Sequence, residues 1–229
     1  MMANHRELLR KVSIFAALSD KELDVLAAGT VERSFEKDAL IVGAEDPGDA
    51  LFIIGAGKVK VVLYGESGRE VILSVLKEGD FFGEMSLLDN QPRSANVRAI
   101  EPTRALVLSR DAFHQVLRGG PQMAIPILAE LSRRLRRADE SIGNLALLDV
   151  YGRVARFLLD LGKHDGVQRE DGLEIRERPT QQHIAAMVGT SRETVSRALN
   201  EFQRRGLIEM DGKYILLKPG FEVEGAGQD

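Results

Sequence analysis

Residues 180–205 read TQQHIAAMVGTSRETVSRALNEFQRR, and they predict the architecture of the C-terminal part of the chain. Apolar side chains recur at helical spacing over residues 180–187 and again over 191–205, so the sequence predicts two helices. Val188-Gly189-Thr190 joins them, and Gly206 stands where a C-terminal cap is expected. A helix, a short glycine turn and a second helix together predict a helix-turn-helix.

The residues around this motif complete a winged helix-turn-helix. Before it, one amphipathic helix is expected from the spacing of Val154, Phe157, Leu158 and Leu161. After it, two short strands are expected over 207–210 and 213–217. They flank Asp211-Gly212, a dipeptide typical of two-residue hairpin turns.

The second helix carries side chains suited to reading DNA bases. Arg192 and Arg197 can each donate two hydrogen bonds to guanine, and Glu193 can accept one from cytosine. Ser196 is short enough to approach a base. The other candidate DNA-binding residues are Thr180, Gln181 and Ser191, and the expected buried anchors are Val195, Leu199 and Phe202.

Simpler interpretations exist for the same side chains. With Thr190, Glu193 forms the spacing of a helix capping box, and the arginines can be a solvated surface. Residues 176–205 hold six arginines and three glutamates, a local charge of +3 in a chain whose formal net charge is −4. A basic surface is what a DNA-binding domain needs, even in an acidic chain.

The N-terminal half has a different pattern. Ser19 and Glu22 have the spacing of a capping box at the start of a short helix. Apolar runs then follow at 51–54, 59–63, 71–75 and 105–108, with turn-forming segments at 46–49, 65–68 and 78–80. Short strands separated by such turns predict a sandwich or jelly-roll barrel over about residues 30–109.

A long helix is expected between the two patterned regions. Its apolar residues alternate in steps of three and four, as in a coiled coil. They are Leu128, Leu131, Leu135, Ala138, Ile142 and Leu145. The remaining face is highly charged, so the stripe favours pairing of two copies of the helix. The alternative is packing of the stripe against the chain's own core.

Two segments of this chain resemble the Crp–Fnr family of transcription regulators. Residues 186–199, AMVGTSRETVSRAL, are similar to its helix-turn-helix signature, and residues 143–150, GNLALLDV, to its hinge. The resemblance implies an α+β fold. A cyclic-nucleotide-binding jelly-roll domain at 1–120 would precede a dimerisation helix at 121–148 and a winged helix-turn-helix at 149–229. It also implies a homodimer that binds a TGTGA-like inverted repeat in promoter DNA and contacts RNA polymerase.

Residues 82–95, FGEMSLLDNQPRSA, form a second motif. Gly83 lets backbone amides approach an anion, Glu84 can accept from sugar hydroxyls, and Arg93 and Ser94 can donate to a phosphate. The segment resembles the phosphate-binding cassette of cyclic-nucleotide-binding domains. That resemblance implies an apolar lining of Val61, Leu73, Ser74 and Met85. The alternative is an ion pair between Glu84 and Arg93 without a ligand.

One departure from the family concerns the effector. In cyclic-AMP-responsive relatives, hydroxyl side chains of the long helix contact the purine, but this chain has Ala138 and Asp139 at the matching positions. Arg134 matches a family position near the phosphate. The family resemblance makes cyclic AMP the leading candidate for the effector. Because Ala138 and Asp139 depart from the usual hydroxyl residues, cyclic di-GMP and cyclic GMP stay open as alternatives. Effector binding is expected to change the ordering of the long helix near Gly143 and so turn the two reading helices.

Composition excludes several other classes of protein. The chain has no cysteine and therefore no disulfide or thiol nucleophile. His5, His114, His164 and His183 are dispersed and match no metal-site spacing, so we expect neither an enzyme nor a metal protein. The N-terminal residues have no signal-peptide pattern, and no apolar run is long enough to span a membrane, which predicts a cytoplasmic protein. A regulatory subunit of an enzyme or channel, or an effector-independent DNA-binding regulator, are the rival functions.

Overall fold

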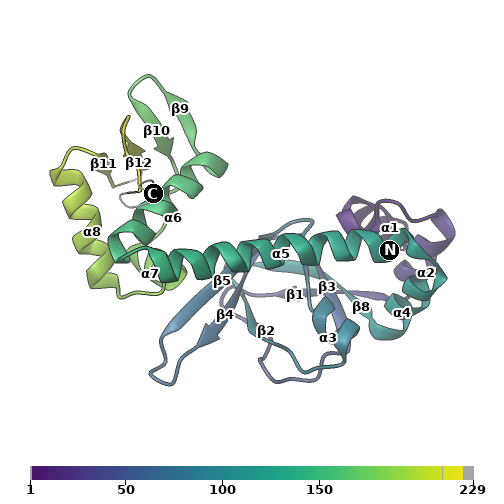
Figure 1. Cartoon of the computed structure of the whole chain (residues 1–229). Coiled ribbons are helices and arrows are strands. Elements are labelled where there is room, and N and C mark those ends of the chain that lie inside the picture. Colours follow the sequence, from purple (N-terminus) through teal and green to yellow (C-terminus); the bar gives the residue numbers. More distant parts are fainter. Residues whose placement is uncertain (1, 213, 224–229) are drawn as a thin grey trace. The chain divides into compact units, whose positions relative to one another are not determined.

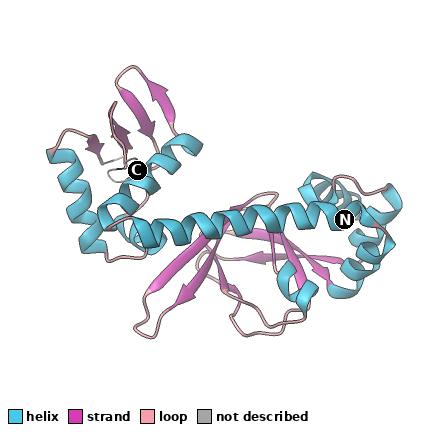
Figure 2. Ribbon diagram, in the orientation of Figure 1, coloured by secondary structure: helices cyan, strands magenta, loops and turns pink. Residues whose placement is uncertain are grey.

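The computed structural model describes residues 2–212 and 214–223, with side chains from residue 5 onward except that of residue 121. It divides into two compact units, residues 1–136 and 137–229. Helix α5 (Pro121–Leu147) contributes residues to both units. Figures 1 and 2 show the helices and strands of each unit.

The N-terminal unit opens with short helices that cover part of its core. They are α1 (Met2–Lys11), a 3-10 turn (Ser13–Phe15) and α2 (Asp20–Ala28). The predicted capping box of α2 is confirmed. Ser19 Oγ accepts from the Glu22 amide, and the Glu22 carboxylate accepts from the Ser19 amide at 2.8 Å. This satisfies backbone donors that the first helical turn leaves without partners.

Two four-stranded antiparallel sheets follow (Figure 2). The first has the order β1-β8-β3-β6, formed by β1 (Thr30–Phe35), β8 (Thr103–Ser109), β3 (Ala50–Ala56) and β6 (Phe81–Phe82). The second has the order β2-β7-β4-β5, formed by β2 (Leu40–Val42), β7 (Asn96–Ala99), β4 (Lys58–Tyr64) and β5 (Glu70–Lys77). The predicted jelly-roll class and its four apolar strands are confirmed. Strands β1, β2, β6 and β7 were not predicted.

Strand β3 lies at the centre of this unit because both of its faces are buried. Leu51 and Ile53 point into a core that is shared with α1, α2 and α4 (Arg110–Gly119). Phe52 and Ile54 alternate with them and pack in a second cluster, together with Val59 of β4. Side chains of a strand point alternately to its two faces, so an unbroken apolar run suits a strand that is covered on both sides.

Helix α5 exposes most of its predicted apolar stripe. Leu128, Leu135, Ile142 and Leu145 keep between 57% and 64% of their surface accessible, and Ala138 is also exposed. Leu131 differs, since it is partly buried against the N-terminal core. Among the residues of the stripe, the alternative of packing against the chain's own core therefore holds for Leu131 alone.

The C-terminal unit has the predicted winged helix-turn-helix. After the end of α5 come α6 (Val150–Asp165), β9 (Val167–Arg169), β10 (Gly172–Ile175), α7 (Gln181–Val188), α8 (Arg192–Arg204), β11 (Ile208–Asp211) and β12 (Tyr214–Leu217). The predicted hairpin is β11–β12, and Lys213, expected at the start of its second strand, lies outside the described residues. The β9–β10 hairpin was not predicted. It extends the sheet to the order β11-β12-β10-β9.

Gly29 allows α2 and α4 to approach closely, which gives a stability prediction. A Cβ at this position would lie 2.3 Å from the Ala112 Cβ. Gly29→Ala should therefore lower the free energy of unfolding by about 1–3 kcal/mol through overpacking. Urea denaturation measures this change. Gly119→Ala is the control, because a Cβ there meets no atom within 4 Å. Equal stability of the two variants would contradict the prediction.

Candidate functional site

The first candidate site is built on Gly83 and the short helix α3 (Glu84–Asp89). Gly83 has a φ of +89°, a conformation that favours glycine. A Cβ at Gly83 would lie 2.4 Å from Arg93 Nη1 and 3.0 Å from the Ala50 carbonyl oxygen. Both the backbone conformation and the lack of space require glycine where the cassette motif has it.

Arg93 is a buried cation, with 5% of its surface exposed. Nη1 donates to the Gly83 carbonyl at 2.8 Å and Nη2 to the Ala50 carbonyl at 2.7 Å. Its guanidinium carbon lies 5.8 Å from the centre of the Phe52 ring. Nε has no hydrogen-bond partner, and no carboxylate of the described residues lies within ion-pair distance of Arg93. Burial lowers the pKa of Arg93, because the charged form loses solvation.

Glu84 is buried to a similar degree, and its partner is Arg134 of α5. Oε1 accepts from Arg134 Nη1 at 2.9 Å, whereas Oε2 is buried without a hydrogen-bond partner in the described part of the chain. Burial raises the pKa of Glu84 above its usual range, and the nearby Arg134 opposes this shift. The alternative of a Glu84–Arg93 ion pair is not what the structure has, since Glu84 pairs with Arg134.

Arg134 also joins this site to its own helix and to β6. Its Nη2 donates to the Phe81 carbonyl at 2.8 Å, and its Nε donates to Glu130 at 3.0 Å. Sequence reasoning missed Glu130, although its i,i+4 spacing to Arg134 was a usable signal. Hydrogen bonds from Arg133 and Arg134 outweigh burial and hold the pKa of Glu130 below its usual range.

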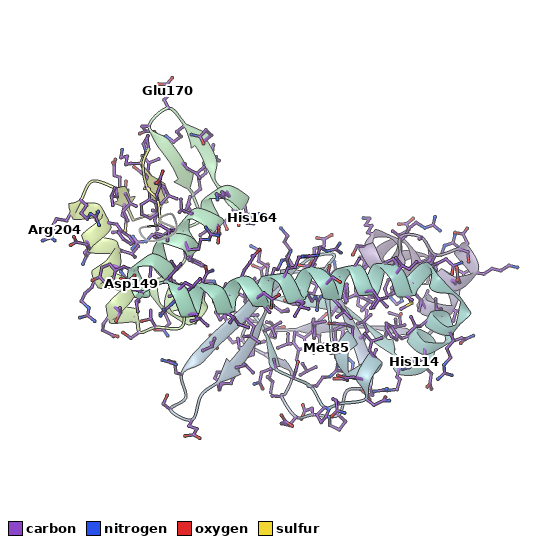
Figure 3. The ribbon with its side chains drawn as sticks, in the orientation of Figure 1. Met85, His114, Asp149, His164, Glu170 and Arg204 are labelled. Atoms are coloured by element: carbon purple, nitrogen blue, oxygen red, sulfur yellow. The ribbon has the colours of Figure 1, made fainter. Side chains whose placement is uncertain are left out.

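The other predicted effector residues lie in three places. Ser94 Oγ is 3.9 Å from Met85 Sδ, and both side chains are exposed; Figure 3 labels Met85 on α3. Val61 pairs with Ser74 across β4 and β5, and Leu73 stands exposed at the register shift beside that pair. Ala138 and Asp139 are exposed on the part of α5 that belongs to the C-terminal unit.

These residues have the chemistry of a site for an anion with hydroxyl groups. Arg93 is a buried cation whose Nε has no hydrogen-bond partner among the described residues, and the exposed Ser94 hydroxyl is adjacent in sequence. A phosphate would supply the negative charge and acceptors that Arg93 lacks. Glu84 Oε2 is a buried acceptor without a donor, and a sugar hydroxyl would satisfy it.

The second candidate site is the helix-turn-helix of the C-terminal unit. Helix α8 begins at Arg192, and its cap is Ser191, whose Oγ accepts from the Thr194 amide at 3.2 Å. The interpretation of Thr190 and Glu193 as a capping box was therefore wrong, because the helix starts one residue later than that spacing requires. Hydrogen bonds from the backbone amide of Glu193 and from Ser191 hold the pKa of Glu193 below its usual range.

The predicted base-reading residues lie at the start of α8. Arg192, Glu193 and Arg197 are exposed, and Ser196 is partly exposed. The expected anchors are confirmed as buried residues of the domain core: Val195, Leu199 and Phe202. Burial of that face leaves the polar face of α8 accessible, which is how a reading helix enters the major groove.

Arg204 and the start of α7 show two other environments. The Arg204 side chain is 78% exposed and pairs with Glu201 at 2.6 Å; Figure 3 shows it extending from α8. Thr180 caps α7 by accepting from the His183 amide at 3.1 Å, and Gln181, the first residue of α7, is partly exposed.

Arg153 of α6 was missed by sequence reasoning. Its Nε donates to the Val188 carbonyl at 3.1 Å, and its Nη1 donates to the Leu148 carbonyl at 3.0 Å. Val188 ends α7, so this cation satisfies an acceptor at the negative end of that helix. Asp149, labelled in Figure 3, caps α6 through the Gly152 amide at 2.7 Å. Through Arg153, Leu148 at the end of the hinge segment is joined to Val188, after which the turn before α8 begins.

Among the described residues, no group of three or more histidine, cysteine, aspartate or glutamate side chains has a metal-binding arrangement. No described helix has the length and apolar character needed to cross a membrane.

Two family models match the chain. A cyclic nucleotide-binding domain matches residues 32–119, and a Crp-like helix-turn-helix domain matches residues 152–220. The first match contains the Arg93 cassette, and the second contains α7 and α8.

Similar proteins match over most of the chain. The CRP-like cAMP-activated global transcriptional regulator of Mycobacterium tuberculosis strain H37Rv is 36% identical, over 92% of this chain and 94% of its own length. The cAMP-activated global transcriptional regulator CRP of Escherichia coli O157:H7 is 37% identical, over 80% of this chain and 87% of its own length.

A solved structure of similar fold is the c-di-GMP-responsive global regulator CLP of Xanthomonas campestris. It superposes with a TM-score of 0.75 and 26% identity, covering 87% of this chain and 99% of that chain. The two family models and these relatives agree with the two domains that the structure has. The chain therefore belongs to the Crp–Fnr family of DNA-binding transcription regulators, with an N-terminal cyclic nucleotide-binding domain.

Proposed function

We propose that this protein is a homodimeric regulator that binds a TGTGA-like inverted repeat in double-stranded promoter DNA in response to a cyclic nucleotide. The proposal places it in the cytoplasm with RNA polymerase as a partner. One observation gives the main support for a cyclic-nucleotide effector. Three buried side-chain polar atoms of the described residues lack a hydrogen-bond partner, and two of them, Arg93 Nε and Glu84 Oε2, belong to the cassette.

In this proposal each cassette residue has one role. Arg93 and Ser94 bind the phosphate, and Glu84 accepts from a ribose hydroxyl. Gly83 leaves room for backbone amides to face the phosphate, and Arg134 balances the charge of Glu84. The base side is lined by Val61, Leu73, Ser74 and Met85, with Ala138 and Asp139 as candidates to contact the base.

Cyclic AMP is the leading effector because the two bacterial relatives above are named as cAMP-activated. Cyclic di-GMP is the next candidate, since a structural neighbour is described as responsive to it. Asp139 supplies an acceptor where a hydroxyl is usual, and an acceptor suits an exocyclic amine of adenine or guanine. Cyclic GMP is therefore included in the test.

The effector prediction concerns Arg93 and Glu84. Arg93→Leu should abolish binding of cyclic AMP in calorimetry, because the phosphate loses a charged donor at a cost of about 2–5 kcal/mol. Glu84→Ala should weaken cyclic AMP and leave 2′-deoxy cyclic AMP little changed. Arg69→Leu, in an exposed turn between β4 and β5, is the matched control. Wild-type affinity in both cassette variants would reject the assignment, and a wild type that binds none of the three nucleotides would favour effector-independent regulation.

The DNA prediction separates base contacts from phosphate contacts. Arg192→Ala should cost about 1–3 kcal/mol and relax the preference at one guanine of the half-site. At the base that Ser196 faces, the half-site can differ from TGTGA. Arg204→Ala should weaken all DNA sequences alike and reduce the salt slope by about 1. Selection from a random DNA pool, with and without effector, measures the base preference, and binding constants at several salt concentrations measure the salt slope. Identical pools from wild type and Arg192→Ala would remove α8 from the reading role.

The dimer proposal rests on the exposed stripe of α5. Leu128, Leu135, Ala138, Ile142 and Leu145 are spaced at steps that place them on one side of a helix, and all are exposed in a single chain. Two copies of this stripe would bury each other as a coiled coil, and two reading helices would then face half-sites one helical turn apart. Effector bound at the cassette would act through α5 and the hinge near Gly143.

Leu135→Asp should convert the dimer into a monomer, because the new carboxylates would face each other in an apolar seam. Analytical ultracentrifugation measures this. Arg136→Asp is the matched control, one residue away on the exposed charged face. Leu131 is unsuitable as a probe because it also packs on the core of its own chain. A dimer as tight as wild type in Leu135→Asp would reject the seam.

A further inference from the structure

Arg110, the first residue of α4, binds three acceptors with one guanidinium group. Its Nη1 donates to Asn90 Oδ1 at 2.6 Å, and its Nη2 donates to the Ser86 carbonyl at 2.9 Å and to the Gly48 carbonyl. Its backbone amide adds a bond to the Asp49 carbonyl at 2.9 Å. Arg110 lies outside the cassette motif in sequence, so the motif assigns no role to it.

Two of these acceptors, on Ser86 and Asn90, belong to the cassette, and the other two, on Gly48 and Asp49, belong to the loop beneath it. Ser86 lies in α3, and Asn90 is its C-terminal cap, held in a left-handed conformation with φ of +59°. Gly48 lies directly under α3, since a Cβ there would be 2.1 Å from the Ser86 Cβ. One cation therefore joins the first turn of α3, its C-terminal end and the loop beneath it.

The same loop holds the backbone of Arg93. The Arg93 amide donates to the Asp46 carbonyl at 2.9 Å, and the Glu45 amide donates to the Arg93 carbonyl at 2.9 Å. A Cβ at Gly48 would also lie 3.4 Å from the Arg93 guanidinium carbon. Arg110 and Arg93 thus hold opposite ends of one loop, residues 45–49, against α3.

We propose that Arg110 is a positioning residue of the effector cassette, which fixes α3 and the 45–49 loop so that Glu84 and Arg93 face one ligand. It acts through its three-way hydrogen bonding, without contacting the effector. The role of the cassette as an effector site is the proposed function on which this inference rests. The Gly48 and Ser86 carbonyls and the Asn90 side-chain oxygen lose a rigid planar donor when Arg110 is replaced, and neither lysine nor glutamine reproduces that fork.

The test compares Arg110→Gln and Arg110→Lys with Arg118→Gln in the full chain. Arg110 and Arg118 line the same surface hollow beside α4, together with Asn90, Asp111, His114 and Gln115. The shortened side chains therefore leave space to solvent and create no buried void. Arg118 is exposed and forms no hydrogen bond or ion pair within the described part of the chain, so it controls for charge loss on the same helix.

The first measurement is hydrogen exchange without ligand. Residues 84–90 should exchange faster in both Arg110 variants and at the wild-type rate in Arg118→Gln. Unchanged exchange in Arg110→Gln overturns the proposal. Wild-type exchange in Arg110→Lys also overturns it, because charge alone would then hold α3 in place.

The second measurement is calorimetry with cyclic AMP and 2′-deoxy cyclic AMP. Both Arg110 variants should bind cyclic AMP about threefold to thirtyfold more weakly. Their preference for cyclic AMP over the 2′-deoxy form should shrink, because α3 begins at Glu84. General destabilisation would weaken both ligands alike, and an unchanged ratio therefore overturns the positioning role. A wild type that binds neither nucleotide rejects the proposed effector instead, and the exchange measurement still decides the role of Arg110.

Discussion

The buried guanidinium of Arg93 constrains the whole N-terminal unit. A buried cation is costly unless it is paired and hydrogen-bonded, and Arg93 has only the carbonyls of Gly83 and Ala50 among the described residues. Those carbonyls come from the turn before α3 and from the start of β3, the strand buried on both faces. The position of Arg93 is thus set by the centre of the jelly roll, and an anion would complete its environment.

Glycines at two positions make this arrangement possible. Side chains at Gly83 and Gly48 would collide with Arg93 and Ser86, respectively. Arg134 and Arg110 then approach the same small helix from two other elements, α5 and α4. Helix α3 is short and has few internal hydrogen bonds, so its position depends on these charged contacts with its neighbours. An effector that changes the partner of Glu84 would reach α5 directly through Arg134.

The C-terminal unit differs in that its arginines are exposed, because DNA binding needs charged side chains at the surface. Val195, Leu199 and Phe202 bury one face of α8, and this leaves Arg192 and Arg197 accessible without a costly buried charge. Arg153 joins Leu148 of the hinge to the carbonyl end of α7. One side chain therefore links Leu148 with the start of the turn between α7 and α8.

Features that depend on local spacing could be predicted from the amino-acid sequence. Apolar periodicity predicted four of the jelly-roll strands, the long helix and the winged helix-turn-helix, and the cassette and reading-helix residues followed from short motifs. Strands β1 and β9 were not predicted, because their exposed polar residues obscure the apolar pattern of a strand. The cap of α8 was misplaced by one residue because Thr190 and Ser191 are both good capping residues.

The pairing of charged groups could not be predicted from the sequence, because it depends on the folded arrangement of distant segments. Glu84 pairs with Arg134, fifty positions along the chain, rather than with Arg93 in the same motif. Arg110 reaches Gly48 across sixty-two positions. Such partners are chosen by how the sheets and helices pack, and local propensity carries no information about that. The burial of Leu131 within an otherwise exposed stripe has the same cause, because a helix face becomes core only where another element covers it.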